Sequence, residues 1–264
     1  MKIKIFALAL ILFGSLTAWS QDNMLDSLDL SFESTPLKEE KIPYFAIAGG
    51  FTGTIFFPNG FGEMNKLIET NFPSMGTERL KGSIFMPGAE GFTAIGIIPN
   101  MRLSFFGAGG SQTIKAVNAD TTRSIDYSLS FNGLSFDYAW VPIRRLAILI
   151  GVNLGWGTMA IEYYRTTKEI NWNDFGEDVN PNNFMSRAEA GFWLIQPHLN
   201  IEFAVTPFIA LRGSAGYSYS LMGNWKFNQN STFPPKPASN KPPDKLNADG
   251  MYVQFGLFLG LFNY

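Results

Sequence analysis

The sequence has no cysteine and only one histidine, and both shortages exclude whole classes of chemistry. Without cysteine there is no disulfide framework, no thiolate metal cluster and no cysteine nucleophile. One histidine leaves little material for a metal site, so we expect neither a metal nor a cofactor. Charged residues are scarce as well, at 16% of the chain, against roughly 25% in an average soluble domain. The formal net charge of −2 provides no basic surface for nucleic acid.

The chain is instead rich in hydrophobic and aromatic residues, which make up 46% and 15% of its 264 residues. Its first 20 residues have the layout of a secretory signal peptide, because two lysines precede an apolar stretch over 5–16 and Ala18-Trp19-Ser20 forms a small-x-small end. That stretch is too short to cross a bilayer as a helix. We therefore predict an exported protein with a signal peptide at 1–20 and an acidic periplasmic lead-in at 21–42.

From residue 43 onward the chain consists of extended runs, separated by three short proline-containing breaks and four longer polar segments. The runs are 44–57, 88–98, 101–117, 124–141, 146–164, 187–206, 208–222 and 250–264. The short breaks are Pro99-Asn100, 142–145 and Thr206-Pro207. The longer segments are 58–86, 118–123, 165–186 and 223–249, and the first of them has room for a short helix over 63–70. An even number of antiparallel strands with this asymmetry is typical of an outer-membrane barrel.

The sequence thus predicts an all-β fold over 43–264, an eight-stranded antiparallel transmembrane β-barrel with short periplasmic turns, long extracellular loops and both termini in the periplasm. Within the runs, apolar positions alternate with small or polar ones, as a wall between lipid and a narrow lumen requires. In the fourth run the apolar parity changes near Asn132-Gly133, where we predict a β-bulge. The alternative, a soluble periplasmic β-sandwich, does not explain the asymmetry of the connections.

The end of the chain, Val253 to Tyr264, is a strand with a terminal aromatic residue. It is similar to the C-terminal signal by which bacterial outer-membrane barrels are recognised by their assembly machinery. Together with the glycine- and aromatic-rich runs 46–57 and 211–219, it makes residues 43–264 resemble the family of small eight-stranded bacterial outer-membrane β-barrels, the outer membrane protein beta-barrel domain.

The resemblance implies a place in the bacterial cell outer membrane, contact with its lipid and lipopolysaccharide, and insertion by the barrel-assembly machinery. Phe258, Phe262 and Tyr264 would form the assembly signal. In the family the terminal aromatic points to lipid, whereas here these three residues fall on the less apolar face of the last run. Either a bulge intervenes or the lumen is partly aromatic. The resemblance implies no particular activity.

Four charged residues lie at matched distances from the predicted turns: Arg102, Asp137, Glu202 and Arg212. Isolated charges inside a narrow barrel are costly, so two arginines and two acids at one level predict an internal salt-bridge network that closes the lumen. A role in transport or gating is the alternative. Eight strands leave room only for their own side chains, which disfavours a continuous aqueous pore.

His198 is expected to point into the lumen at the level of Asn153, with Ser214 on the next run. A hydrogen-bonded lumen histidine is the simpler interpretation. A catalytic triad would need a hydroxyl within about 2.6 to 3.2 Å of the imidazole, and no motif marks a nucleophile. Aromatic residues near strand ends, Tyr44 among them, are interpreted as interfacial girdles.

These observations favour a monomeric, integral outer-membrane barrel with a structural or surface-interaction role and an unidentified extracellular or periplasmic partner. We predict neither a general porin nor an enzyme. The first alternative is a small conduit for apolar or amphipathic solutes. The second is a lipid-A-modifying hydrolase or acyltransferase centred on His198.

Overall fold

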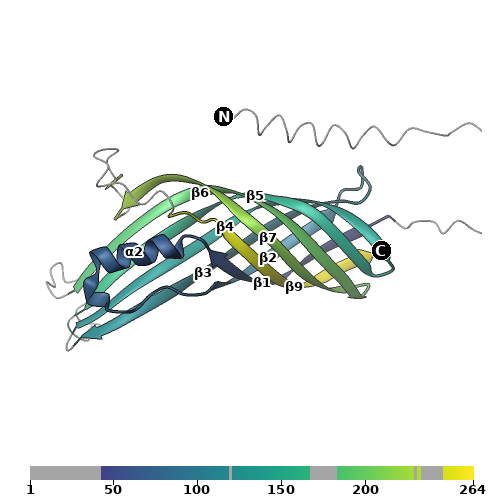
Figure 1. The fold of residues 1–264 in the computed structure, drawn as a ribbon. Coiled ribbons are helices and arrows are strands. Elements are labelled where there is room, and N and C mark those ends of the chain that lie inside the picture. The colour runs from purple at the N-terminus through teal and green to yellow at the C-terminus, as the bar shows by residue number, and fades with distance from the viewer. Residues whose placement is uncertain (1–42, 119–120, 167–182, 229–230, 233–245) are drawn as a thin grey trace, which may run out of the picture. The chain divides into compact units, whose positions relative to one another are not determined.

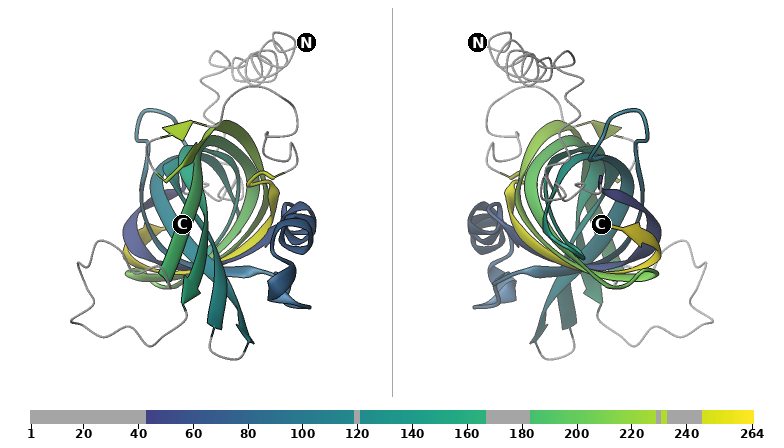
Figure 2. Two further views of the ribbon diagram at one scale, coloured as in Figure 1. Left: turned by 90° about the vertical axis from the view of Figure 1, so that its left-hand side faces the viewer. Right: turned by 90° about the vertical axis from the view of Figure 1, so that its right-hand side faces the viewer.

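A computed structural model describes residues 43–118, 121–166, 183–228, 231–232 and 246–264, so the predicted signal peptide and lead-in lie outside the described residues. Eight antiparallel strands close into a ring (Figures 1 and 2). They are β1 (Phe45–Pro58), β2 (Ile84–Ala94), β3 (Met101–Asn118), β4 (Thr121–Ile143), β5 (Leu146–Thr166), β6 (Asn183–Thr206), β7 (Ile209–Phe227) and β9 (Gly250–Asn263). The ring closes where β1 and β7 both pair with β9. The predicted eight-stranded barrel is confirmed.

Three short turns join strands at one end of the barrel, over 95–100, 144–145 and 207–208, and we call this the turn end. The opposite end is the loop end. It holds helix α2 (Phe61–Asn71), the short 3-10 helix η1 (Pro73–Met75) and the two-residue strand β8 (Ser231–Thr232), which pairs with the end of β7. No helix in the described ranges is both long enough and apolar enough to span a membrane.

Several strands extend beyond the predicted runs, β6 by four residues at its start and β7 by five at its end. The second strand begins at Ile84 and ends at Ala94, four residues earlier than the predicted run at each end. The predicted loop over 118–123 is mostly strand, because β3 and β4 pair as far as Asn118 and Thr121.

The outer wall carries an apolar band that begins at the turn end. On β5 every outward residue from Leu146 to Trp156 is apolar, and Thr158 is the first polar one. This stretch covers about 33 Å at about 3.3 Å per residue. At a tilt of about 40° its height is about 25 Å, which is that of the apolar band on outer-membrane barrels. Trp156 and Trp193 stand side by side at its upper edge, with ring centroids 6.1 Å apart, as an interfacial girdle requires.

The predicted bulge near Asn132-Gly133 is wrong. β4 pairs without interruption with β3 and with β5 through this region, and the only register shift on β4 lies between Trp140 and Ile143. The odd-numbered residues of β4 from Ile125 to Ala139 face inward, and what changes is their chemistry, from Ser135 and Asp137 to Phe131 and Leu129.

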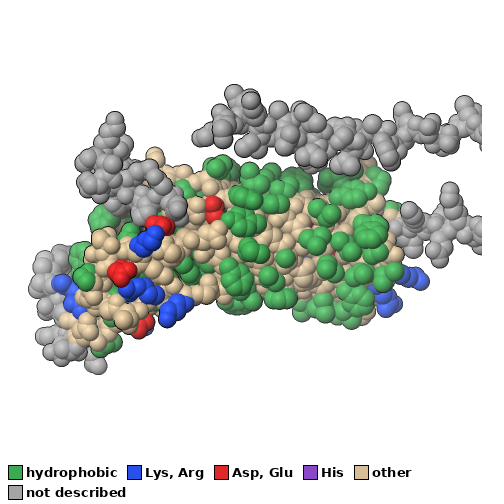
Figure 3. Space-filling view, in the orientation of Figure 1, with side chains coloured by type: hydrophobic (Ala, Val, Ile, Leu, Met, Phe, Trp, Pro, Cys, Tyr) green, Lys and Arg blue, Asp and Glu red, His purple; other side chains and the backbone are tan. Residues whose placement is uncertain are grey.

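The two halves of β4 therefore meet opposite surroundings. Within the band, Leu134 and Tyr138 face outward and polar residues face inward. Beyond the band, Ser130 faces outward, and the inward side chains are buried apolar residues. That is the pattern of a sheet in water, which buries its apolar face. Figure 3 shows the same division, with hydrophobic side chains toward the turn end and charged residues of both signs at the loop end.

The interior of the loop-end half is an apolar core to which α2 contributes. Phe61 and Ile68 of α2 are buried, and the Phe61 ring lies 5.4 Å from that of Tyr127 on β4. Because β2 pairs with β3 only from Ala108 toward the turn end, the outer part of β3 has no partner strand on that side. Its Asn118 side chain instead donates to the Ser74 carbonyl of η1 at 3.0 Å. The loop-end half is thus a packed core.

Candidate functional site

The turn-end half of the lumen contains a buried network of charged side chains. At its centre is Arg102 of β3, which has no exposed surface. Its Nε and Nη2 atoms donate to Asp137 Oδ2 on β4 at 3.0 and 2.9 Å. Its Nη1 atom donates to Glu202 Oε2 on β6 at 2.9 Å. The structure thus brings together three of the four charges that the sequence placed at one level.

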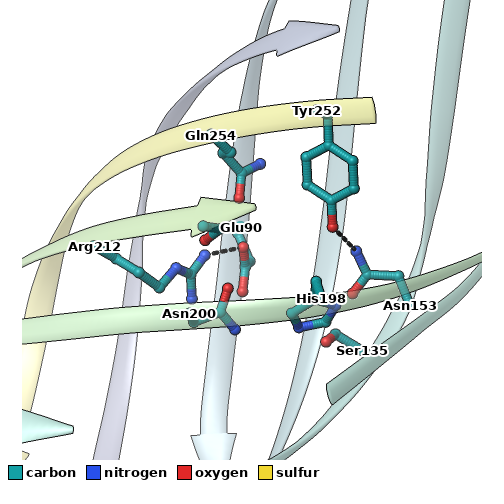
Figure 4. A pocket seen from close by; sticks show the side chains of 9 residues that line it. Glu90, Ser135, Asn153, His198, Asn200, Arg212, Tyr252 and Gln254 are labelled. Atoms are coloured by element: carbon teal, nitrogen blue, oxygen red, sulfur yellow. Dashed lines mark hydrogen bonds and ion pairs between the residues drawn. The ribbon is translucent and has the colours of Figure 1, made fainter. Parts of the chain in front are cut away.

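The fourth, Arg212, pairs elsewhere. Its Nη2 atom donates to Glu90 Oε2 of β2, across the lumen from β7 (Figure 4). The guanidinium also lies over the Phe258 ring, 4.2 Å from its centroid, while that of Arg102 lies 4.5 Å from the centroid of Phe92. The network therefore has two ion-paired parts with aromatic rings packed against both cations, an arrangement that favours cations in a desolvated site.

His198 joins the network through Asp137. Its Nε2 atom lies 2.6 Å from Asp137 Oδ1, and its Nδ1 atom lies 3.2 Å from the Gln196 carbonyl oxygen. Since the carboxylate and the carbonyl are both acceptors, the ring donates to both only as the imidazolium. In that form His198, Arg102 and Arg212 balance three carboxylates in charge: Asp137, Glu202 and Glu90.

The polypeptide backbone makes room for this cluster at Gly151. This glycine lies opposite Asp137 in the β4–β5 ladder. A Cβ atom at Gly151 would overlap the Asp137 carboxylate and lie 2.6 Å from the Phe136 carbonyl oxygen. The inward glycine on β5 is therefore a requirement of the network and not only of strand packing.

Two tyrosines close the turn end beneath the charges. The hydroxyl groups of Tyr44 and Tyr264 both donate to Glu202 Oε1, at 3.1 and 2.7 Å, and the two rings stack with centroids 5.0 Å apart. Tyr44 is 3% exposed, so its interpretation as an interfacial girdle residue is wrong.

The three aromatic residues of the predicted assembly signal, Phe258, Phe262 and Tyr264, all point into the lumen and are buried. The ladders of β9 with β1 and β7 contain no register shift, so no bulge turns them outward. The last strand therefore departs from the family pattern, because its lumen side is aromatic. An assembly role for these residues stays a prediction.

A small polar void remains between the two parts of the network, about 10 Å³ in volume, which is close to the least that holds one water molecule. Asn153 borders it and donates to Gln196 Oε1 at 3.0 Å and to the Tyr252 hydroxyl at 3.5 Å (Figure 4). Ser214 also borders it, and its Oγ atom has no partner among the described residues. His198, Asn153 and Ser214 are thus neighbours, but both imidazole nitrogens face other acceptors and no serine–histidine hydrogen bond is formed.

Sequence reasoning missed three members of this site. Glu90 lies within the predicted run 88–98 but was overlooked, because that run was continued over residues 95–98 of the turn, which do not alternate, and so showed no clear polar face. Tyr44 was assigned to an interfacial girdle and Tyr264 to the assembly signal, so neither hydroxyl was expected to bind Glu202. A count of charges gave no sign of Glu90, because Arg102 and Arg212 are already balanced by Asp137 and Glu202 without it.

Within the described ranges, no group of three or more acidic, histidine or cysteine side chains could hold a metal ion. The network fills the lumen at the height of the apolar band with ion-paired side chains, as buried charges require, while Arg212 Nε and Nη1 have no hydrogen-bond partner among the described residues.

The closed ring of strands and the outward apolar band define the class of the protein, an eight-stranded transmembrane β-barrel. No protein-family model matches the sequence, and no curated protein matches it. The structure is similar to that of a major outer membrane protein from Thermus thermophilus, with a TM-score of 0.49 and 11% identity over 82% of this chain and 99% of that one.

It is also similar to the attachment invasion locus protein Ail of Yersinia pestis, with a TM-score of 0.35 and 9% identity over 84% of this chain and 99% of Ail. Acinetobacter baumannii CarO2 gives a TM-score of 0.36 and 8% identity over 81% of this chain and 99% of CarO2. At these identities the likeness concerns the fold.

Proposed function

We propose that the protein is a sealed barrel of the bacterial outer membrane, with a structural or surface-interaction role and no general transport activity. The observation that carries the proposal is the double obstruction of its interior. The turn-end half is filled by the ion pairs of Arg102 and Arg212 and the rings around them. The loop-end half is filled by the apolar core that includes α2.

The orientation follows from the ends of the barrel. Barrels of this class have short turns on the periplasmic side and longer loops outside the cell, and this general rule supports a turn end, with both barrel termini, that faces the periplasm. β4 then continues from Asn132 to Thr122 above the apolar band, about 33 Å along the strand and about 25 Å in height at the usual tilt. A raised, polar-sided stalk of this kind suits contact with partners outside the cell.

Planar-bilayer recordings of the refolded full chain test the sealed lumen. We expect conductance indistinguishable from that of the bare bilayer over a wide voltage range. Stable open steps in most insertions would refute the proposal and favour the conduit for small solutes. Membrane fractionation and heat-modifiable migration on gels test the location, and a chain recovered only in the soluble periplasmic fraction would refute it.

The lipid-modifying alternative depends on His198. Since its two nitrogens contact Asp137 and Gln196, we expect His198→Ala to leave the lipid A profile of cells unchanged. Ser214→Ala is the matched variant for the nearest free hydroxyl. A lipid A species that disappears in both variants and returns with the wild type would establish the enzyme instead.

A further inference from the structure

The charges that the barrel exposes are distributed unequally between its two ends. The turn end carries Arg144 and Arg145 in the β4–β5 turn, both exposed. No acidic side chain is exposed at that end within the residues that the structure describes, and Figure 3 shows only Lys or Arg there. The exposed acids of the described ranges belong to the loop-end half: Glu69, Glu78, and the partly exposed Glu63, Asp126, Glu162, Glu189 and Asp249. Among the exposed side chains of the described residues, those of the turn end thus carry positive charge alone.

The same end exposes large apolar side chains on each of its three turns. Ile97 is 93% exposed, Ile143 63% and Phe208 62%. Trp140, just before the β4–β5 turn, is 61% exposed on the outer wall. Exposed apolar surface of this kind marks contact with a membrane or a partner. Apolar side chains at the tips of turns are removed from water if the turns reach into the membrane interface.

The conformation of Arg145 adds a second, independent indication. Its φ is 73°, in the left-handed region that glycine and asparagine adopt most readily. The β2–β3 turn follows that rule, with Asn100 at φ 64°. An arginine held in a disfavoured conformation at a turn suggests that its side chain is needed there. The backbone fixes the turn, since Arg145 N donates to the Tyr264 backbone oxygen at 2.9 Å and its carbonyl accepts from Ala204 N at 2.9 Å.

We propose that the β4–β5 turn is a binding site for the phosphate of an anionic phospholipid in the periplasmic leaflet. Arg144 and Arg145 would hold the phosphate, and Ile143 and Trp140 would contact the part of the acyl chains next to the headgroup. Neither guanidinium forms a hydrogen bond or ion pair with another described residue, so both are available. Arginine suits this role because its planar donors match phosphate geometry. The inference rests on the proposed place of the turn end in the periplasm.

Native mass spectrometry of the full chain, released from micelles doped with phosphatidylglycerol or with phosphatidylcholine of the same acyl chains, tests this site. We expect the wild type to retain phosphatidylglycerol in preference. Each arginine should contribute about fivefold to that preference, because the binding free energy of one basic residue near an anionic membrane surface corresponds to about that ratio. Arg145→Gly should therefore reduce it about fivefold, and the double variant with Arg144→Gln about 25-fold.

Arg145→Gly separates binding from folding, because glycine suits φ 73° and should leave the turn as stable or more stable. Lys115→Gln on the loop-end part of β3 is the matched control and should change nothing. Unchanged phosphatidylglycerol retention in the double variant would overturn the proposal. Equal loss of both lipids, or displacement of the lipid by inorganic phosphate, would also overturn it. A wild-type chain that is not recovered in the outer-membrane fraction would refute the proposed location instead.

Discussion

Replacing Arg102 by methionine tests whether the lumen network is held by its central cation. The substitution keeps most of the side-chain volume but leaves Asp137 and Glu202 buried, 1% and 0% exposed, without the cation that both contact. Removing one partner of a buried ion pair costs about 3 to 5 kcal/mol, because an uncompensated charge remains. His198 still contacts Asp137, and Tyr264 still donates to Glu202, so we expect a loss of unfolding free energy near 3 kcal/mol.

The loss is measured by urea unfolding of the refolded barrel in thin-bilayer vesicles, followed by tryptophan fluorescence and by the heat-modifiable gel shift. The control is a triple variant that adds Asp137→Asn and Glu202→Gln to Arg102→Met. It removes the charges together with the cation and should recover most of the stability, since well-packed neutral groups often replace buried ions without cost. A loss below about 1 kcal/mol in Arg102→Met, or a triple variant less stable than the single one, would refute the reasoning.

Three further predictions concern the band, the packing around the network and the loop-end core. Ile150→Arg on the outer face of the band should cost about 2 to 4 kcal/mol of unfolding free energy, whereas Ser130→Arg above the band should cost about 0 to 1 kcal/mol; equal costs in the same urea assay would contradict the assigned membrane position. Gly151→Ala should cost about 1 to 3 kcal/mol of unfolding free energy, because the carboxylate opposite it must move. The control Gly213→Ala should be neutral, since its Cβ would meet nothing within 4 Å. A neutral result for both would show that the carboxylate can move without loss of stability. Ile68→Ala should remove about 2 to 5 kcal/mol of packing, seen as faster amide hydrogen exchange in α2, and unchanged exchange would mean that α2 does not depend on this core.

Much of the fold could be predicted from the sequence because a barrel wall has a simple requirement, repeated on every strand. On β6, apolar Leu199 and Ile201 alternate with polar His198 and Asn200, and the structure places the two sets on opposite faces. The three short turns were marked by proline and asparagine, whose backbone preferences are local. Such features need no knowledge of what lies across the barrel.

The wrong prediction of a bulge arose because the outer face of every strand was assumed to meet lipid along its whole length. Near Asn132 the apolar parity changes, and a chain entirely within lipid would need a bulge to do this. The strand instead leaves the band, and water then takes the outer face while Phe131 and Tyr127 enter a core with α2. Sequence periodicity reports which face is apolar, but not whether the apolar face meets lipid or the interior.

The pairing within the network was also beyond the sequence, for a geometric reason. Arg102 and Asp137 are opposite each other in one ladder, as are Glu202 and Arg212, and ladder neighbours are the pairs that sequence spacing suggests. Arg212 nevertheless binds Glu90 from β2, on the other side of the ring. In a narrow closed barrel the shortest path between two side chains runs across the lumen, and that path depends on the closure of all eight strands.

The polar interior also accounts for the unbroken register of β4. A one-residue slip of any strand would exchange its two faces. In the turn-end half it would move Asp137 into lipid, and in the loop-end half it would move Tyr127 and Leu129 out of the core. The inward face of the strand is polar in the turn-end half and apolar in the loop-end half. A one-residue slip is therefore destabilising in both halves. The ion pairs at the centre of the barrel therefore specify which face is inside, a role that needs no net stabilisation by the pairs themselves.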